Sequence, residues 1–370
     1  MANQFIEVKE IARRLLPRLI ENLVFPNLVY KDYSNEFVKG KGSRIQVKKP
    51  VVLKSEDFDQ STGTKAQDVV EDSTEVALDK LATVDVEFST IQMVTNVDDL
   101  DRLFLEPAAV ALAEKINADG LELYKDIPYC TGTAGTTPST LNDIADARRM
   151  LNVNKVPVKG RIAIWDPEAD ANFTTIPAIV NAEKSGSTQA LREGSIGRVM
   201  GLENYMAQDV KKHKGGSLAG STDLKAKSKT DAGKTQIILT KSSLEGDLKK
   251  GDILTILKNS YVVTQDTKAS SNDITVDIYP ALKTDVTTST AIKIEAPHTA
   301  NLVFNPNAFA FVTRPLPSPA GVEAYTTSYN GITLRVVRGY DMHFKKEMLS
   351  MDVLYGYATM YPELATRVLG

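Results

Sequence analysis

The chain has 370 residues, with 44 Lys and Arg against 47 Asp and Glu, so its formal net charge at pH 7 is −3. This length predicts more than one domain, because a single hydrophobic core rarely grows beyond about 250–300 residues. The near-neutral charge argues against a dedicated nucleic-acid-binding protein, which normally shows a basic excess. No apolar run approaches the roughly 18 residues of a membrane span, so we expect no membrane partner. Cys130 is the single cysteine, which excludes an intrachain disulfide.

Residues 5–24 have apolar side chains at three- and four-residue spacings, which predicts an amphipathic helix. Arg13, Arg14 and Arg18 lie off this apolar stripe, and Pro17 is expected to kink or split the helix. The helix either packs on the chain's own core or acts as an arm that docks on a neighbour or an assembly factor.

Polar and apolar residues alternate over 44–47 and again over 83–88, which predicts two half-buried strands of a long hairpin. Between them, residues 55–75 carry seven acidic side chains and one lysine. Loops of about 20 structureless residues are unusual in a compact domain unless they are functional or disordered. The segment is therefore either an extended arm that a neighbouring molecule orders or a surface loop. Its acidic residues are Glu56, Asp57, Asp59, Asp68, Glu71, Asp72 and Glu75.

The longest helix is expected over 98–126, where apolar residues recur at helical spacing and Pro107 suits the first turn. A shorter helix is expected over 140–151, because Thr140 and Asp143 fit a capping box.

Short apolar runs predict strands over 161–165 and 202–206, with a helix between them that ends near Ala182. Towards the C-terminus, Asn330–Gly331 predicts the turn of a hairpin. The last strand is expected over 350–359, where apolar and polar residues alternate.

Composition changes abruptly after Lys211. Residues 213–234 are rich in Gly, Ser, Thr and Lys, which is typical of a linker or mobile loop. Short β-type runs follow at close intervals, and their spacing predicts a small β-barrel or sandwich. We therefore interpret residues 212–298 as a domain inserted into a loop of a larger one. The runs are 236–240, 252–257, 261–265, 274–279 and 291–294.

The motifs that would carry catalysis or ligand binding are incomplete. Gly233-Lys234-Thr235 ends like a phosphate-binding loop, but Ser228 stands where that pattern needs a glycine. No zinc site is expected, because the histidines at 213, 298 and 343 have neither an i+4 histidine nor a neighbouring cysteine. We therefore predict a protein that is not an enzyme, with no catalytic residues, cofactor or metal.

Four stretches together resemble the major capsid proteins of tailed bacteriophages, which share the HK97-like fold. The order and spacing of these stretches match the family over nearly the whole chain. Within this family, the inserted domain and the Lys249-Lys250-Gly251-Asp252 turn most resemble the coat protein of the Salmonella short-tailed temperate phage. The four stretches are Glu193–Arg198 with Gly201–Tyr205, Asn301–Asn305 with Ala308–Pro317, Tyr355–Ala365, and Trp165-Asp166-Pro167.

The resemblance implies an α+β, HK97-like fold with peripheral and axial domains and an inserted small β-barrel. It divides the chain as follows: 1–40 N-terminal arm, 41–90 extended β-hairpin loop, 91–150 peripheral domain with a spine helix, 151–211 first part of the axial domain, 212–298 inserted β-barrel, and 299–370 second part of the axial domain with a return to the peripheral domain.

The implied function is that of a major capsid protein, assembled in the host bacterial cytoplasm into the virion. Pentamers and hexamers of the chain would form an icosahedral shell around a double-stranded DNA genome. The implied partners are the chain itself, a scaffolding protein, a portal protein at one vertex and a decoration protein, with only weak, non-specific DNA contact. We expect Glu56, Asp57, Asp59, Asp68, Glu71 and Asp72 to contact a neighbouring subunit, and Arg13, Arg14 and Arg18 to contact the scaffold.

Two alternatives remain at this point. One is an encapsulin-like bacterial nanocompartment shell that encloses cargo enzymes. The other is a soluble hydrolase or binding protein with a β accessory domain, which would be a monomer or dimer with a concave polar pocket.

Overall fold

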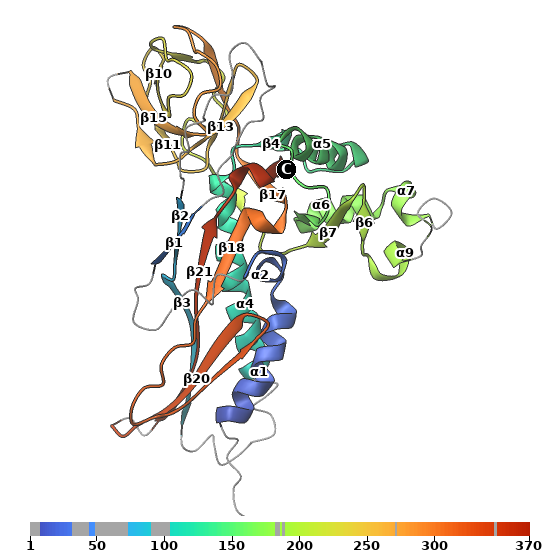
Figure 1. Ribbon diagram of the computed structural model, residues 1–370, viewed down its shortest axis with the longest axis vertical. Helices are drawn as coiled ribbons and strands as arrows, with labels where there is room; N and C mark the ends of the chain where they lie inside the picture. Colours follow the sequence, from blue (N-terminus) through green and yellow to red (C-terminus); the bar gives the residue numbers. More distant parts are fainter. Residues whose placement is uncertain are drawn as a thin grey trace, which may run out of the picture. The chain divides into compact units, whose positions relative to one another are not determined.

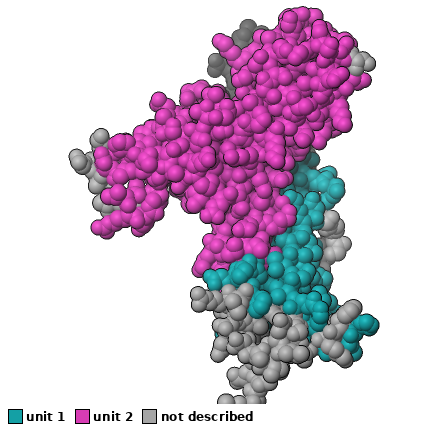
Figure 2. All heavy atoms as spheres, turned by 180° about the vertical axis from the view of Figure 1, so that it is seen from behind, with its two compact units in different colours: residues 1–16, 31–108, 310–360 teal, residues 17–30, 109–309, 361–370 magenta. Residues whose placement is uncertain are grey.

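The computed structural model describes residues 8–31, 44–48, 73–89, 104–181, 186, 189–270, 272–343 and 346–370. The chain divides into two compact units, which Figure 2 colours separately. Unit 1 comprises Met1–Leu16, Lys31–Ala108 and Ala310–Met360, and unit 2 comprises Pro17–Tyr30, Ala109–Phe309 and Tyr361–Gly370. No helix among the described residues is long and apolar enough to cross a membrane.

Unit 1 is built around β21 (Lys346–Thr359), the long central strand of a five-stranded sheet. One edge of β21 pairs antiparallel with β3 (Lys80–Ser89) and the other with β20 (Ile332–Asp341). The remaining strands are β18 (Phe309–Thr313), which also bonds β21, and β19 (Glu323–Tyr329), which pairs with β20. The 14 residues of β21 are what allow one strand to serve three partners.

The hairpin predicted at Asn330–Gly331 is confirmed. Asn330 and Gly331 connect β19 to β20 with positive φ angles of 52° and 72°, as a two-residue turn that matches the strand twist requires. Across β20 and β21, Arg335 donates two hydrogen bonds to Asp352, at 3.0 and 2.5 Å. The pairing register is therefore supported by a largely buried ion pair as well as by the backbone.

The two strands predicted to form one long hairpin pair with other strands instead. The strand β1 (Arg44–Lys48) pairs with β2 (Ser73–Ala77), whereas the expected partner strand, within β3, pairs with β21. Alternation marks a strand but not its partner, which depends on which neighbour buries the apolar face; Val76 of β2 is fully buried. Glu75 therefore belongs to a strand and lies 2.8 Å from Arg44.

The N-terminal helix α1 (Val8–Asn22) buries its predicted apolar stripe and continues through Pro17 without being split. Burial of the stripe offsets the hydrogen bond that proline removes. A short helix, α2 (Phe25–Leu28), follows in unit 2, where Phe25 packs on Phe304 and Phe309 with ring centroids 5.8 and 5.6 Å apart.

The longest α-helix is α4 (Glu106–Leu121), which continues as a 3-10 turn, η3 (Glu122–Asp126). Pro107 stands in the first turn of α4, as predicted. The expected start of this helix, 98–103, falls outside the described residues.

Unit 2 contains a seven-stranded sheet in which β22 is held between β4 and β17. This corrects the prediction that the last strand covers 350–359, because β22 follows it. Every residue of β22 is buried, so its sequence lacks the alternation that marks half-buried strands. The strands are β4 (Cys130–Gly132), β22 (Ala365–Leu369), β17 (His298–Phe304), β5 (Arg161–Trp165), β7 (Leu202–Met206), β6 (Arg198–Val199) and β8 (Lys212–His213).

The helices of this unit follow local signals. The capping box at Thr140 and Asp143 starts α5 (Leu141–Val153), as predicted. The single helix expected to end near Ala182 is instead two, α6 (Pro167–Thr174) and α7 (Pro177–Val180), since Pro177 cannot continue the first. The remaining short helices are α9 (Gln189–Glu193), η4 (Pro306–Ala308) and η5 (Pro362–Leu364).

The inserted barrel is confirmed. Six strands close on one another in the order β10-β15-β13-β12-β16-β9, and β11 and β14 form a separate pair beside them; several carry labels in Figure 1. The strands are β9 (Leu224–Ala226), β10 (Gln236–Thr240), β11 (Asp247–Leu248), β12 (Ile253–Ile256), β13 (Asn259–Val263), β14 (Thr267–Lys268), β15 (Asp273–Tyr279) and β16 (Ala291–Ile294).

Part of the predicted linker is structural. Leu224 and Ala226 are buried in the barrel core, and β9, which carries them, closes the barrel between β10 and β16. The paired stretch at Lys212–His213 likewise joins the seven-stranded sheet through β17. These strands could not be recognised in the polar sequence around them, because each is only two or three residues long.

Strands β2 and β21 approach each other closely at Gly356, and a substitution there tests this packing. A Cβ at this position would overlap the carbonyl oxygen of Ala77, and backbone cannot move aside cheaply. We expect Gly356→Ala to lower the free energy of unfolding by roughly 1–3 kcal/mol, measured by urea denaturation. The matched control is Gly339→Ala on β20, where the new Cβ would meet only Val322, at 4.0 Å. Equal stability of the two variants would contradict this packing.

Candidate functional site

Five polar side chains of unit 2 gather where the barrel meets the seven-stranded sheet. We call them the junction cluster: Tyr124, His213, Asp252, His298 and Arg367. All are buried, with exposed fractions between 0% and 5%. They come from η3, β8, the turn before β12, β17 and β22, so the cluster joins the inserted barrel to the body of the unit.

Asp252 is the acceptor at the centre of the cluster. Its Oδ1 lies 2.7 Å from Nε2 of His213, and its Oδ2 accepts hydrogen bonds from the backbone N–H groups of Gly216 (3.1 Å) and Lys249 (2.7 Å). On the other side of the ring, Nδ1 of His213 lies 3.0 Å from the Tyr124 hydroxyl. With the proton on Nε2, the imidazole donates to the carboxylate and accepts from the tyrosine.

Arg367 supplies the buried positive charge. Its Nε donates to the carbonyl of Ile127 and its Nη1 to that of Gly251, both at 2.8 Å, while its guanidinium lies 5.2 Å from the centre of the Tyr124 ring. Burial lowers the pKa of Arg367 to about 10, which still leaves it charged at neutral pH. Gly251 turns with a φ of 101°, and a Cβ there would lie 2.9 Å from a carbon of Lys125.

His298 lies directly opposite His213 in the β8–β17 pairing, and the two rings are 5.3 Å apart. Its Nδ1 donates to the carbonyl of Ala296 at 2.8 Å. Burial lowers the pKa of His298 to about 4, so the ring is neutral at physiological pH. Its Nε2, like Nη2 of Arg367, finds no hydrogen-bond partner among the described residues.

The Tyr124–His213–Asp252 series has the order of a nucleophile, base and orienting acid. Two observations argue that this series is structural. All three side chains are shut off from solvent, and burial raises the pKa of Tyr124 to about 12, so its hydroxyl stays protonated. Within the described ranges, no group of three His, Cys, Asp or Glu side chains could hold a metal ion. The cluster is arranged to hold segments together.

The thiol of Cys130 is close to this region but is not activated. Its Sγ lies 3.5 Å from the hydroxyl of Ser260, and burial raises its pKa. A raised pKa keeps the sulfur as a thiol, which is a weak nucleophile.

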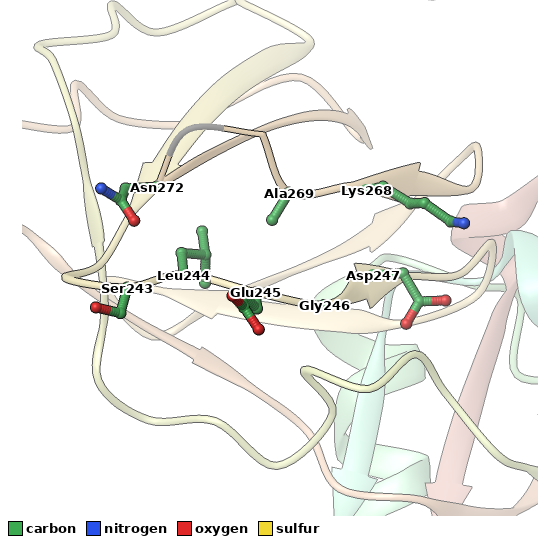
Figure 3. Close-up of a pocket in the computed structure, with 8 residues that line it drawn as sticks. All are labelled: Ser243, Leu244, Glu245, Gly246, Asp247, Lys268, Ala269 and Asn272. Atoms are coloured by element: carbon green, nitrogen blue, oxygen red, sulfur yellow. The ribbon is translucent and has the colours of Figure 1, made fainter.

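An open groove of about 750 Å³ runs along the barrel between the 243–247 and 268–272 segments. Figure 3 shows Asn272 and Ser243 at one end and Lys268 and Asp247 at the other. The Asp247 carboxylate is already engaged by Ser217, whose hydroxyl and backbone N–H donate to it at 2.6 and 2.9 Å. The Asp247 carboxylate is therefore already held by hydrogen bonds within the chain.

The structure describes only some of the contact residues predicted from the sequence. The acidic residues Glu56, Asp57, Asp59, Asp68, Glu71 and Asp72 lie outside the described residues. On α1, Arg13 and Arg14 are exposed and Arg18 is half-buried, and Arg14 pairs with Glu10 at 2.7 Å. Their roles as contacts with a subunit or a scaffold stay predictions.

Sequence reasoning missed the junction cluster. It placed His213 on a linker and His298 at a domain edge, whereas the structure buries both together. A usable signal was Arg367, a charged residue directly before the apolar pair Val368–Leu369. Charge beside such a pair indicates a buried partner, because an unpaired buried ion is costly.

Replacing Arg367 tests the junction. We expect Arg367→Lys to lower the free energy of unfolding by roughly 1–3 kcal/mol, because one ammonium cannot reach both carbonyl oxygens with the geometry of the guanidinium. Chemical denaturation measures the change. The control is Arg149→Lys on the exposed face of α5, where the ion pair with Asp146 is solvated and a change within about 0.5 kcal/mol is expected. Comparable losses in both would show that the junction adds little.

Comparisons with known proteins agree with this fold. No protein-family model matches the chain. A curated relative from Acyrthosiphon pisum secondary endosymbiont phage 1, named major capsid protein, is 21% identical over 97% of this chain and 97% of its own length. A solved chain of Mycobacterium phage Che8 superposes with a TM-score of 0.56 at 16% identity, covering 94% of this chain and 90% of that one. A chain from the mature capsid of bacteriophage PhiM1 gives a TM-score of 0.51 at 10% identity, covering 100% and 89%.

The particular likeness to the Salmonella phage coat protein stays a prediction. The fold prediction is confirmed, since the structural neighbours share the HK97-like architecture and the barrel is present. The chain therefore has the HK97-like fold of these structural neighbours, and it is similar along its full length to a phage major capsid protein.

Proposed function

We propose that the chain assembles into the pentamers and hexamers of an icosahedral shell that encloses a double-stranded DNA genome. The observation that carries this proposal is the similarity to a phage major capsid protein over 97% of both chains. The encapsulin-like nanocompartment is not favoured, because that full-length relative comes from a phage. The virion capsid is accordingly where the chain works.

The surface of unit 1 supports association with further copies. Several large apolar side chains of unit 1 are strongly exposed, among them Tyr329 (67%) on β19, Met342 (77%) after β20 and Met348 (48%) on β21. Large exposed apolar side chains are the kind of group that an interface with another protein covers. A net charge of only −3 leaves little overall repulsion between copies.

The acidic segment is proposed to contact a neighbouring subunit. Its charges would set the register between subunits more than they would add affinity, since exposed charge pairs are individually weak. We likewise propose that Arg13, Arg14 and Arg18 contact a scaffolding protein. A portal at one vertex, a decoration protein and weak, non-specific DNA contact complete the proposed partners, and the arm, peripheral and axial boundaries belong to the same proposal.

Assembly of the purified chain tests the proposed function. We expect closed shells or five- and six-fold rings by negative-stain microscopy and sedimentation, with the yield raised by co-expression of the scaffolding protein. If the acidic segment steers assembly, the initial rate should also fall between about 50 and 500 mM salt, where the screening length shortens from over 10 Å to a few Å. A monomer or dimer under all conditions would overturn the proposal.

Charge reversal on α1 tests the scaffold contact. Arg13→Glu with Arg14→Glu should leave the chain folded, because both side chains are exposed, but should abolish the scaffold-dependent gain in shell yield. Arg149→Glu, on an exposed face of α5, is the control for added negative charge. Scaffold-dependent yield that persists in the α1 variant would remove this contact from the proposal.

A further inference from the structure

The barrel is a folded body with its own core. Eighteen buried residues form one apolar cluster within it, including Leu239, Tyr261 and Val276. Its strands close completely, so the barrel has no sheet edge through which to join the rest of unit 2. Its attachment therefore depends on the two chain crossings and on side-chain contacts.

Several polar contacts between the barrel and the rest of the unit gather at the Lys249–Asp252 turn. This turn receives the hydrogen bond from Arg367 at Gly251 and the one from His213 at Asp252. At its rim, Lys250 pairs with Asp126 at 2.8 Å. Buried hydrogen bonds and charges therefore hold this turn against the rest of the unit, whereas apolar packing holds the barrel itself together.

The charges that face His298 come from three packed elements. Arg367 on β22 and His213 on β8 oppose a proton on its ring, and Asp252 in the barrel turn favours one. Farther out, Asp126 and Glu122 of η3 and the Cys130 thiol face Arg367 and Tyr124. The Asp252 carboxylate is already engaged by His213 and two backbone N–H groups, so a second buried cation would find no free partner in the cluster.

We propose that the junction cluster is an acid-released clasp: a proton on His298 separates the Lys249–Asp252 turn from the sheet, while the barrel itself stays folded. Opening exposes the imidazole to water, where it accepts the proton without the repulsion from Arg367. The device follows from the cluster geometry and does not depend on the proposed shell function.

The direction of the pH dependence follows from the pKa of His298. Burial holds that pKa at about 4 in the closed junction, whereas a solvated histidine titrates near 6.5. The open form therefore binds more protons between these two values. Opening should become more favourable as pH falls from about 6.5 to about 4, by a factor on the order of 10², and level off below that.

Hydrogen exchange on the unassembled full chain tests the clasp. Protection factors, corrected for intrinsic rates, are compared at pH 7.5 and pH 4.5. We expect the segment 211–216, whose Gly216 N–H donates to Asp252, to lose protection at acid pH while β10 and β15 of the barrel core keep theirs. Loss of protection in all of these together, or in none, would overturn the proposal.

Two histidine variants assign the effect. His298→Gln cannot titrate and should remove the acid response, whereas the matched control His343→Gln, at an exposed turn of unit 1, should keep it. An acid response that survives in His298→Gln overturns the proposal. If that variant is already open at pH 7.5, NMR titration of the wild-type imidazoles decides: a His298 midpoint near 4 supports the clasp, and one near 6.5 refutes it.

Discussion

Arg367 is a permanent cation at a position with no access to water, and the packing of unit 2 depends on how that charge is accommodated. An uncompensated buried ion costs several kcal/mol, so strand β22 can dock only where acceptors await its guanidinium. Those acceptors are the carbonyls of Ile127, just before β4, and Gly251, just before β12 of the barrel. The docking of β22 and the seating of the barrel turn are therefore coupled.

This coupling explains how a whole barrel is accommodated within another fold. The barrel buries its apolar residues in a core of its own, so it does not need apolar packing against the rest of unit 2. Polar contacts are therefore sufficient to connect the two. Interfaces between domains of one chain are commonly more polar than domain cores. Here the joint also contains His298, whose protonation burial and the nearby Arg367 oppose, so its stability is tied to protonation in a way that an apolar joint would not be.

The same features fit a protein whose work is association. The titratable side chains of the junction cluster are buried away from solvent, where they stabilise the fold. The groups that solvent does reach include large apolar side chains on the sheet of unit 1 and arginines on α1. Burying surfaces against further copies is what a shell subunit must do, and the full-length similarity to a phage major capsid protein points the same way.

Features that depend on residues close together in the chain could be predicted from the sequence. The capping box at Thr140, the Asn330–Gly331 turn and the short barrel strands were predicted because each follows from backbone preference or alternation over a few residues. The resemblance in four stretches carried the fold and the function, since it drew on order and spacing along the whole chain.

Which distant segments of the chain meet could be seen only in the folded structure. The partner of β1, the central place of β22 and the junction of His213 with Asp252 join residues that no local pattern connects; His213 and Asp252 are 39 residues apart, and Arg367 reaches across 116 to Gly251. Burial creates these relations, because a polar group becomes costly only once water is removed from it. A linker-like composition around His213 therefore gave no sign that the histidine would become part of a buried clasp.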